Sequence, residues 1–318
     1  MNMMQALTAV QAELAMVEQE MYRLIDTRNS FLQESARYFL RATGKRMRPA
    51  LVLLAGKCGR ETMGENSIRA AVALEFLHAA SLVHDDVIDQ SRRRRGIATV
   101  NARWDNRAAV LLGDYFYSKA LAQAAKCGNG VVRILAELVE CLVAGECGQW
   151  KAIDNLALSE EEYYQMIEMK TARFIAICCR LGALAGKAPA KLQEALAAYG
   201  RNLGMAYQIR DDILDLLGDE QTTGKPKFAD LSNGNITLPV IHALAAGRYR
   251  DELARLLKAR NGSEEICRLL HEGGSIKYTL ARVKKYVQLA KECLQPLPKG
   301  QGYESLCRIA DLTELRLN

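Results

Sequence analysis

The sequence predicts an all-α fold, and three observations lead to this expectation. Apolar residues recur at steps of three and four along most of the 318-residue chain, and the period-two alternation typical of strands is nowhere sustained. Only 6 residues are proline, and none lies between Pro49 and Pro189, so long uninterrupted helices can form there. Hydrophobic residues make up 49% of the chain, which is ample for a large core. We therefore expect a single all-α domain over residues 1–318.

The individual helices follow from pattern and composition. From Arg69 to Asp89, and again over 203–217, apolar residues recur at helical spacing. Alanine- and leucine-rich stretches at 108–125 and 181–198 favour helix because both residues have high helix propensity. Glycine, proline and short polar residues mark the breaks between helices, at 56–66, 127–130, 186–190, 218–235 and 297–302. None of these breaks resembles a flexible linker between domains.

Composition excludes several functional classes. The net charge of +6 comes without a lysine-rich tail or a basic-aromatic stripe, which favours a small anionic ligand over nucleic acid. The 9 cysteines include no CxxC pair, so we expect reduced thiols in a cytoplasmic protein and no zinc site. The N-terminus lacks a basic region, and no stretch of uncharged apolar residues is long enough to span a bilayer. We therefore expect neither a signal peptide nor a transmembrane segment.

One short acidic sequence occurs twice, near the ends of two expected helices: "DDVID" at 85–89 and "DDILD" at 211–215. In each, the first and last aspartates are four residues apart and lie on one helix face, with the middle one about 100° away. Three carboxylates there repel one another and the helix dipole. One such cluster is as easily a solvated helix end, but two copies indicate bound cations.

Aspartate oxygens select Mg²⁺ or Mn²⁺ over softer metals. Mg²⁺ held by one or two carboxylates completes its shell with water and phosphate oxygens, so the ligand should carry phosphate. Four arginines, 92–95, follow the first cluster and can either neutralise it on a solvated surface or bind the same phosphate directly. The chain contains neither GxxxxGK[ST] nor GxGxxG, so no nucleotide-binding loop is expected.

A set of ordered motifs makes this hypothesis specific. The motifs are "GKRMRP" (44–49), "EFLHAASLVHDDVIDQSRRRRG" (75–96), "MKTARF" (169–174), "YQIRDDILD" (207–215), "GKP" (224–226) and "TLPVI" (237–241). With them, about residues 25 to 245 resemble the trans-prenyltransferases, or polyprenyl diphosphate synthases, of the isoprenoid synthase superfamily. The resemblance implies a helical bundle with a central active-site cavity.

The resemblance also implies a reaction. Members of this family condense isopentenyl diphosphate head to tail with an allylic diphosphate, such as farnesyl or geranylgeranyl diphosphate, and release diphosphate. It implies three Mg²⁺ ions, for which Mn²⁺ can substitute, bound by Asp85, Asp86, Asp89, Asp211, Asp212 and Asp215. Loss of diphosphate from an allylic carbon separates charge, so metals and arginine placed at the leaving group lower the barrier.

The remaining site residues follow from the same motifs. Arg94, Lys170 and Lys225 would contact the allylic diphosphate directly. Lys45, Arg48, His78 and Arg95 would form a metal-free site for isopentenyl diphosphate. Thr171 and Gln208 would face the reacting carbons. Taken singly, each of these is more simply a surface charge, a core histidine or a buried amide, and only their joint occurrence in family order favours the functional interpretation.

Two positions depart from the family pattern. Phe228 stands where glycine is common, which could change how its loop covers the site. Asn235 stands where lysine is common, which puts one diphosphate contact in doubt. The C-terminal "TELRLN" lacks the basic cluster of short-chain relatives and leaves only Arg316 nearby.

Small residues upstream of the first cluster predict a long product. One helical turn rises about 5.4 Å, close to one isoprene unit, so successive turns of the helix measure the growing chain. Short-chain members carry an aromatic residue four or five positions before the first aspartate, where this chain has Ser81 and Ala80. The next turns offer Leu77 and Leu74, and Phe116 or Tyr117 could form the floor. We expect about six to ten isoprene units (about C30–C50) by this turn counting, as in quinone side chains.

Other functions stay open at this stage. A farnesyl or geranylgeranyl diphosphate synthase differs only in product length. A terpene cyclase is disfavoured by "DDILD" and "GKRMRP", and a non-catalytic subunit by the retention of all six aspartates. A nucleic-acid-binding protein has only the four arginines in its favour. The resemblance further implies a homodimer, with a small non-catalytic subunit as an alternative.

Overall fold

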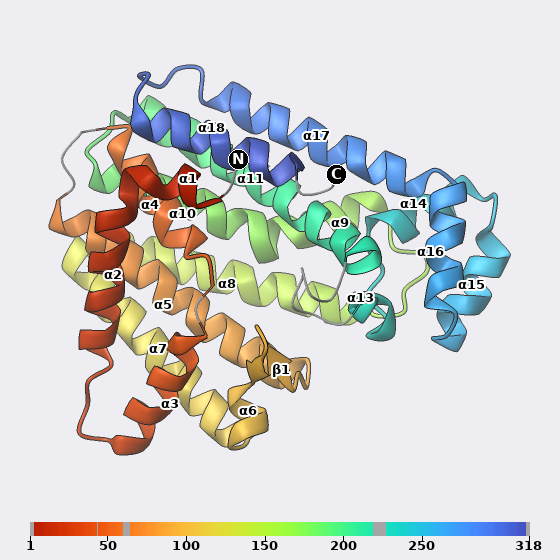
Figure 1. The fold of residues 1–318 in the computed structure, drawn as a ribbon, viewed down its shortest axis with the longest axis horizontal. Coiled ribbons are helices and arrows are strands. Elements are labelled where there is room, and N and C mark those ends of the chain that lie inside the picture. The colour runs from red at the N-terminus through yellow and green to blue at the C-terminus, as the bar shows by residue number, and fades with distance from the viewer. Residues whose placement is uncertain (1–2, 43, 60–63, 219–226, 316–318) are drawn as a thin grey trace. The chain divides into compact units, whose positions relative to one another are not determined.

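The computed structural model describes residues 3–42, 44–59, 64–218 and 227–315, which are mostly helical, as predicted (Figure 1). The elements are α1 (Met3–Leu7), η1 (Thr8–Val10), α2 (Gln11–Leu24), α3 (Ser30–Arg41), α4 (Met47–Lys57), α5 (Glu65–Ile88), β1 (Arg93–Arg94), β2 (Ile97–Ala98), α6 (Val100–Arg103), α7 (Asn106–Cys127), α8 (Asn129–Ala152), α9 (Glu160–Ile167), η2 (Glu168–Ala172), α10 (Arg173–Ala185), α11 (Ala190–Leu217), α13 (Ala229–Ser232), α14 (Leu238–Ala246), α15 (Arg250–Ala259), α16 (Ser263–Glu272), α17 (Ser275–Cys293) and α18 (Gln301–Leu315). No helix in these ranges is long and apolar enough to cross a membrane.

The chain divides into two compact units. The first contains Met1–Glu137, Ile177–Ala197 and Pro296–Arg308, and the second contains Leu138–Ala176, Ala198–Gln295 and Ile309–Asn318. Each unit carries one aspartate cluster, the first at the end of α5 and the second at the end of α11. The sequence predicts a single domain over 1–318 with a central cavity. Because this expectation depends on both units together, it stays a prediction.

In the first unit, α4 and α5 form the core. Every residue from Pro49 to Gly56 and from Ala70 to Leu77 is buried, because these stretches are apolar except for Glu75 and helices surround them. α7 packs along α5, and α2 and α4 contact it as well. α5 leaves the core only in its last turn, where Asp89 is exposed. The first aspartate cluster therefore lies where a buried helix reaches the surface.

A two-stranded hairpin at 93–98 departs from the all-helical prediction. Arg93 pairs with Ala98 and Arg94 with Ile97, and the turn residues Arg95 and Gly96 have φ of +51° and +82°. Positive φ at both central positions is typical of a type I′ turn, which matches the twist of the strands. Strands of two residues are too short to show alternation, so sequence periodicity could not reveal them. The hairpin directs the arginines back toward the end of α5.

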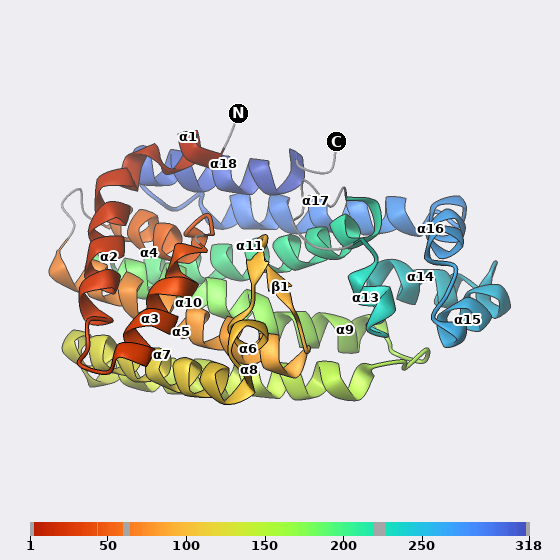
Figure 2. The ribbon, with the colours of Figure 1, turned by 60° about the horizontal axis from the view of Figure 1, so that its bottom comes forward.

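In the second unit, α14 contacts α9, α15, α16 and α17. The short helices α14, α15 and α16 cluster beside the N-terminal part of α17 (Figure 2). The short helix α13 falls inside the predicted break at 218–235. The other predicted breaks coincide with gaps between helices, as at Cys127 and Asn129. A second irregular element is η2, a π-helical segment between α9 and α10.

Candidate active site

The three aspartates of the first cluster have different surroundings. Asp86 is 2% exposed, and its Oδ1 accepts a hydrogen bond from Nε of Arg94 at 2.8 Å. Nδ2 of Asn101 donates to the backbone carbonyl of the same aspartate at 3.2 Å. Asp85 is half-buried and Asp89 exposed, and they lie one turn apart on the same face. Asp86 thus anchors the hairpin, whereas Asp85 and Asp89 are more exposed than Asp86.

Cationic groups surround His78, about two helical turns before that cluster. Nη1 of Arg48 lies 2.9 Å from Nε2 of His78. Burial first, and then the charges of Arg48, Arg95 and Arg94, hold the pKa of His78 well below its ordinary value of 6.5. The imidazole is therefore neutral, and its Nε2 can accept from Arg48. This concentration of positive charge is suited to an anion.

The loop before α4 is fastened to α5 by an ion pair that the sequence motifs did not identify. Nη1 of Arg46 lies 2.7 Å from Oε1 of Glu75, and their side chains are 17% and 9% exposed. Arg46 has a φ of +47° at the start of α4. The pair fixes the segment that carries Lys45 and Arg48. A glutamate inside an apolar helix requires a partner, and this is the signal that could have revealed it.

Arg95, predicted to bind the same substrate as Lys45, lies against the same loop. Its Nη1 donates to the carbonyl of Ala42 at 3.0 Å, and a side chain added to Gly44 would collide with its guanidinium at 2.5 Å. The structure therefore brings Arg95 together with the "GKRMRP" segment. Asp86, Arg94 and Arg95 also line a small pocket with residues of α3.

The middle aspartate of the second cluster is also buried. Asp212 is 4% exposed, and it accepts from the hydroxyl of Tyr163 at 2.5 Å and from Nε2 of Gln208 at 2.9 Å. Burial, and next the charge of Asp230, raise the pKa of Asp212 well above 3.8. Tyr163 was not among the predicted site residues, and nothing in its sequence position distinguishes it.

The other two aspartates of this cluster differ from Asp212. Asp215 accepts hydrogen bonds from the backbone N–H groups of Ala229 and Asp230, each at 3.1 Å, and so fixes the start of α13. Asp211 accepts from Arg210 at 2.7 Å, and its side chain is 44% exposed. Its exposure makes Asp211 the best placed of the three to bind a cation.

Lys170 and Thr171 lie on the π-helical segment η2, a conformation frequent at functional sites. Nζ of Lys170 lies 2.6 Å from Oε2 of Glu146 and 2.8 Å from Oε1 of Gln149, both on α8. A Cβ on Gly145 would lie 2.9 Å from the backbone nitrogen of Lys170, so glycine is what allows this close approach.

The two polar residues predicted to face the reacting carbons are hydrogen-bonded to each other. The hydroxyl of Thr171 donates to Oε1 of Gln208 at 2.8 Å, and Gln208 in turn donates to Asp212. Both amide ends of Gln208 are therefore fixed. The pair connects η2 with the second aspartate cluster.

The predicted tunnel residues lie on α5 and α7 of the first unit. Leu74, Leu77 and Ala80 are buried, and the hydroxyl of half-buried Ser81 donates to the carbonyl of His78 at 2.9 Å. Phe116 is fully buried, with its ring 5.6 Å from that of Phe39 and 5.7 Å from that of Phe76. The ring of Tyr117 lies 5.9 Å from that of His84. Their role as a tunnel wall stays a prediction.

Two residues named from the sequence, Lys225 and Arg316, lie outside the described residues. Phe228 has a φ of +63° just before α13, where glycine would be unstrained. Asn235 donates from Nδ2 to Oδ1 of Asp230 at 3.2 Å.

The acidic donors fit a hard divalent cation. Among the residues that the structure describes, no three His, Cys, Asp or Glu side chains gather into a preformed metal centre. Mg²⁺ does not need one, because it is usually bound through one or two carboxylates plus water and substrate phosphate. Asp85 and Asp89 offer such a pair of oxygen ligands on one helix face.

This helical fold, with its two aspartate clusters accompanied by cationic side chains, is that of an isoprenoid synthase. Residues 29–272 match the polyprenyl synthetase family. The chain belongs to this family and is a prenyltransferase.

Known proteins resemble the chain over nearly its full length. Heptaprenyl diphosphate synthase component 2 of Bacillus subtilis (strain 168) is 37% identical over 303 residues, which cover 94% of this chain and 86% of that protein. A decaprenyl diphosphate synthase from Rhodobacter capsulatus has a TM-score of 0.93 at 30% identity and covers 100% of both chains. A polyprenyl synthase from Caulobacter crescentus CB15, complexed with calcium and isoprenyl diphosphate, has a TM-score of 0.93 at 29% identity and covers 98% and 97% of the two chains.

Proposed function

We propose that this protein is a Mg²⁺-dependent synthase that extends an allylic diphosphate with isopentenyl diphosphate to about C30–C50, by the turn counting above. One observation carries the proposal: at the end of α5 the half-buried Asp85 and the exposed Asp89 share one helix face, about two turns after the group of cations around His78. Such a site can bind one diphosphate through metal and another without it.

The two diphosphates need different treatment. The allylic one must leave, and bound Mg²⁺ would neutralise the charge that develops on it. We assign the metal ligands to Asp85, Asp89 and Asp211, and direct contacts to Arg94, Lys170 and Lys225. Isopentenyl diphosphate must not ionise, so its assigned partners are Lys45, Arg48, His78 and Arg95. The planar guanidinium groups of the two arginines would fix its orientation.

The reaction then breaks the bond between the allylic C1 and its diphosphate oxygen and forms a bond from that C1 to C4 of isopentenyl diphosphate. A proton leaves C2 of the isopentenyl unit, and the released diphosphate accepts it. Thr171 and Gln208 supply oxygen dipoles toward the developing carbocation. Their mutual hydrogen bond holds both oxygens in place before the reaction begins.

A long product for quinone side chains is the assignment that the residues on α5 favour. Ser81 and Ala80 are small, so the first turns before the aspartates present no aromatic stop. The names of the Bacillus and Rhodobacter relatives, heptaprenyl and decaprenyl diphosphate synthase, support the same range.

We place the protein in the cytoplasm as a homodimer. On α7, Val110, Leu111 and Leu121 are 43%, 58% and 43% exposed, which is unusual for large apolar residues on one helix and typical of an interface. The Bacillus relative is named as component 2 of its enzyme, so a second, non-catalytic subunit is the alternative partner.

Metal dependence and the role of α5 can be tested together. The purified chain is incubated with isopentenyl and farnesyl diphosphate, with Mg²⁺ or with excess EDTA, and diphosphate release is followed. We expect turnover only with Mg²⁺ and a loss of about 100-fold in Asp85→Asn, because this carboxylate would hold the metal that neutralises the leaving diphosphate. Asp251→Asn, a change at an exposed aspartate on α15, serves as the matched control. Full turnover in EDTA would refute the proposal.

A further inference from the structure

A continuous chain of hydrogen bonds runs from Lys170 to Asp230 within the second unit. Nζ of Lys170 donates to Oε1 of Gln149 at 2.8 Å. Nε2 of Gln149 donates to Oδ1 of Asn235 at 3.4 Å, and Nδ2 of Asn235 donates to Oδ1 of Asp230 at 3.2 Å. The chain ends beside the second aspartate cluster, because the backbone N–H of Asp230 donates to Asp215 at 3.1 Å.

All three bonds of this chain point the same way, and its two ends dictate that direction. The ammonium of Lys170 can only donate, and the carboxylate of Asp230 can only accept. Each amide between them has one accepting and one donating end. Asn235 must therefore turn its nitrogen to Asp230 and its oxygen to Gln149, and Gln149 must turn its oxygen to Lys170.

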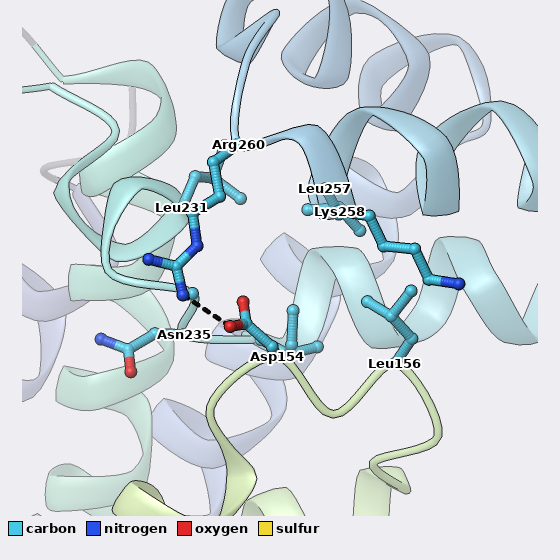
Figure 3. Close-up of a pocket in the computed structure, with 9 residues that line it drawn as sticks. Asp154, Leu156, Leu231, Asn235, Leu257, Lys258 and Arg260 are labelled. Atoms are coloured by element: carbon cyan, nitrogen blue, oxygen red, sulfur yellow. Dashed lines mark hydrogen bonds and ion pairs between the residues drawn. The ribbon is translucent and has the colours of Figure 1, made fainter.

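The loop that carries Asn235 is held in place at a neighbouring pocket of about 160 Å³ (Figure 3). The backbone N–H of Asp154 donates to the carbonyl of Gly234 at 2.9 Å, and the carboxylate of Asp154 forms an ion pair with Arg260 at 2.5 Å. Gly234 has a φ of +77°, and a Cβ there would collide with that carboxylate. Asn235 is therefore fixed by its backbone as well as by Asp230.

We propose that Gln149 and Asn235 are positioning residues that hold the ammonium of Lys170 for the allylic diphosphate. Asn235 sets the orientation of the Gln149 amide, and the Gln149 oxygen then directs Lys170 together with the carboxylate of Glu146 at 2.6 Å. The proposal rests on the assignment of Lys170 to that diphosphate. In this proposal Asn235 accepts from Gln149 and donates to Asp230. A lysine at this position could only donate, so it could not take this role.

Two substitutions break the direction of the chain, and together they restore it. A lysine at 235 donates to the Gln149 oxygen, so the Gln149 amide turns its nitrogen toward Lys170. Two hydrogen-bond donors then face each other. A glutamate at 149 turns an acceptor toward the oxygen of Asn235. In the double variant the carboxylate at 149 accepts from both lysines, so every bond has a donor and an acceptor again.

The experiment measures KM for farnesyl diphosphate, KM for isopentenyl diphosphate and kcat for the full-length protein. We expect Asn235→Lys and Gln149→Glu each to raise KM for farnesyl diphosphate about tenfold, since each misplaces a bond to a charged group. The double variant should return to within about threefold of wild type by the non-additivity of coupled sites. KM for isopentenyl diphosphate should stay within about twofold, because the proposal assigns Lys170 to the allylic diphosphate and not to isopentenyl diphosphate.

A charge effect alone predicts different results. An added lysine beside a diphosphate site would lower KM for the anion, so a KM at or below the wild-type value in Asn235→Lys would overturn the proposal. Asn233→Lys is the matched control, because it adds the same charge at an exposed position of the same loop. Equal rescue of Gln149→Glu by Asn233→Lys would also overturn it.

Two further measurements distinguish a failure of this proposal from a loss of stability and from a failure of the proposed function. If Asn235→Lys melts below the assay temperature, Asn235→Ala and Gln149→Ala replace the pair, and their effects on KM must be non-additive. Additive effects would contradict the coupling of these two residues through the chain of hydrogen bonds. A wild-type protein that forms no prenyl product would instead contradict the proposed function.

Discussion

Asp86 and Asp212 are the second aspartates of the two DDxxD sequences, and both are buried, at 2% and 4% exposure. A residue one position along a helix is rotated by 100°, so the second aspartate points away from the face that the first and last share. Asp86 holds Arg94, and Asp212 holds Tyr163 and Gln208. The acidic pattern predicted two clusters but could not show that one member of each turns inward.

At the residue scale, Asp212→Asn should stabilise the metal-free protein. Because the folded protein holds the pKa of Asp212 above 3.8, it binds more protons than the unfolded chain, and its stability falls as the pH rises above 3.8 through the folded pKa. Asparagine accepts from Gln208 and donates to the hydroxyl of Tyr163 without a buried charge. We expect a gain of about 1 kcal/mol at pH 7, measured by thermal unfolding in EDTA. A variant less stable than wild type at every pH would contradict the assignment.

His78 should impose the opposite pH dependence. Its folded pKa lies below 6.5, so its contribution is complete above pH 6.5 and is lost as the pH falls from 6.5 toward the folded pKa. Relative to His78→Gln, wild-type stability should decline by at most about 1.4 kcal/mol per pH unit below 6.5 and stay level above it. Denaturant titrations of both proteins from pH 5 to 8 measure this difference. A constant difference across that range would show that His78 is not buried as a neutral group.

At the scale of elements, the two departures from regular helix both carry site residues. The hairpin at 93–98 directs Arg94 and Arg95, and η2 carries Lys170 and Thr171. Helical periodicity predicted α5 and most of the breaks, because long apolar runs and turn residues dominate there. It could not show the hairpin, whose strands are two residues long, or the short π-helical segment η2.

Gly145→Ala should impair binding of the allylic diphosphate through η2. Its Cβ would lie 2.9 Å from the backbone nitrogen of Lys170, so η2 has to shift. We expect KM for farnesyl diphosphate to rise about fivefold, as for the loss of a hydrogen bond to a charged group. Gly148→Ala is the control, since nothing lies within 4 Å of its added carbon, and it should behave as wild type. Equal kinetics for both variants would refute the close-approach argument.

Ser81→Phe should shorten the product, because its ring would extend beside α5 one turn before Asp85. We expect products of about C15–C20 by the rise of one isoprene unit per turn. Chromatographic sizing of the dephosphorylated products measures the change. Gln288→Phe at an exposed position of α17 is the control. An unchanged length in Ser81→Phe would remove this residue from the tunnel wall.

At the scale of the whole molecule, each compact unit contributes one aspartate cluster, and ordered motifs in the sequence indicated both. The family and the all-α fold are confirmed by the comparisons. Pairs such as Arg46 with Glu75, or Lys170 with Gln149, were not predictable because their members are far apart in sequence and belong to no common motif. Only the folded chain brings them together.

The exposed apolar side chains of α7 predict a homodimer. Leu111→Glu would place a charge in the expected interface, and light scattering after size exclusion should then report the monomer mass. Asp251→Lys, at an exposed position of α15 outside this face, should leave the dimer intact. A wild-type monomer at micromolar concentration would contradict the homodimer.

The central claim, a long-chain prenyltransferase, is tested most directly by the length of the product. The purified wild-type chain alone is incubated with Mg²⁺, farnesyl diphosphate and an excess of isopentenyl diphosphate, and the dephosphorylated products are sized. We predict all-trans products of about C30–C50, given small residues over the first turns before Asp85. Products that stop at fifteen or twenty carbons would contradict this assignment.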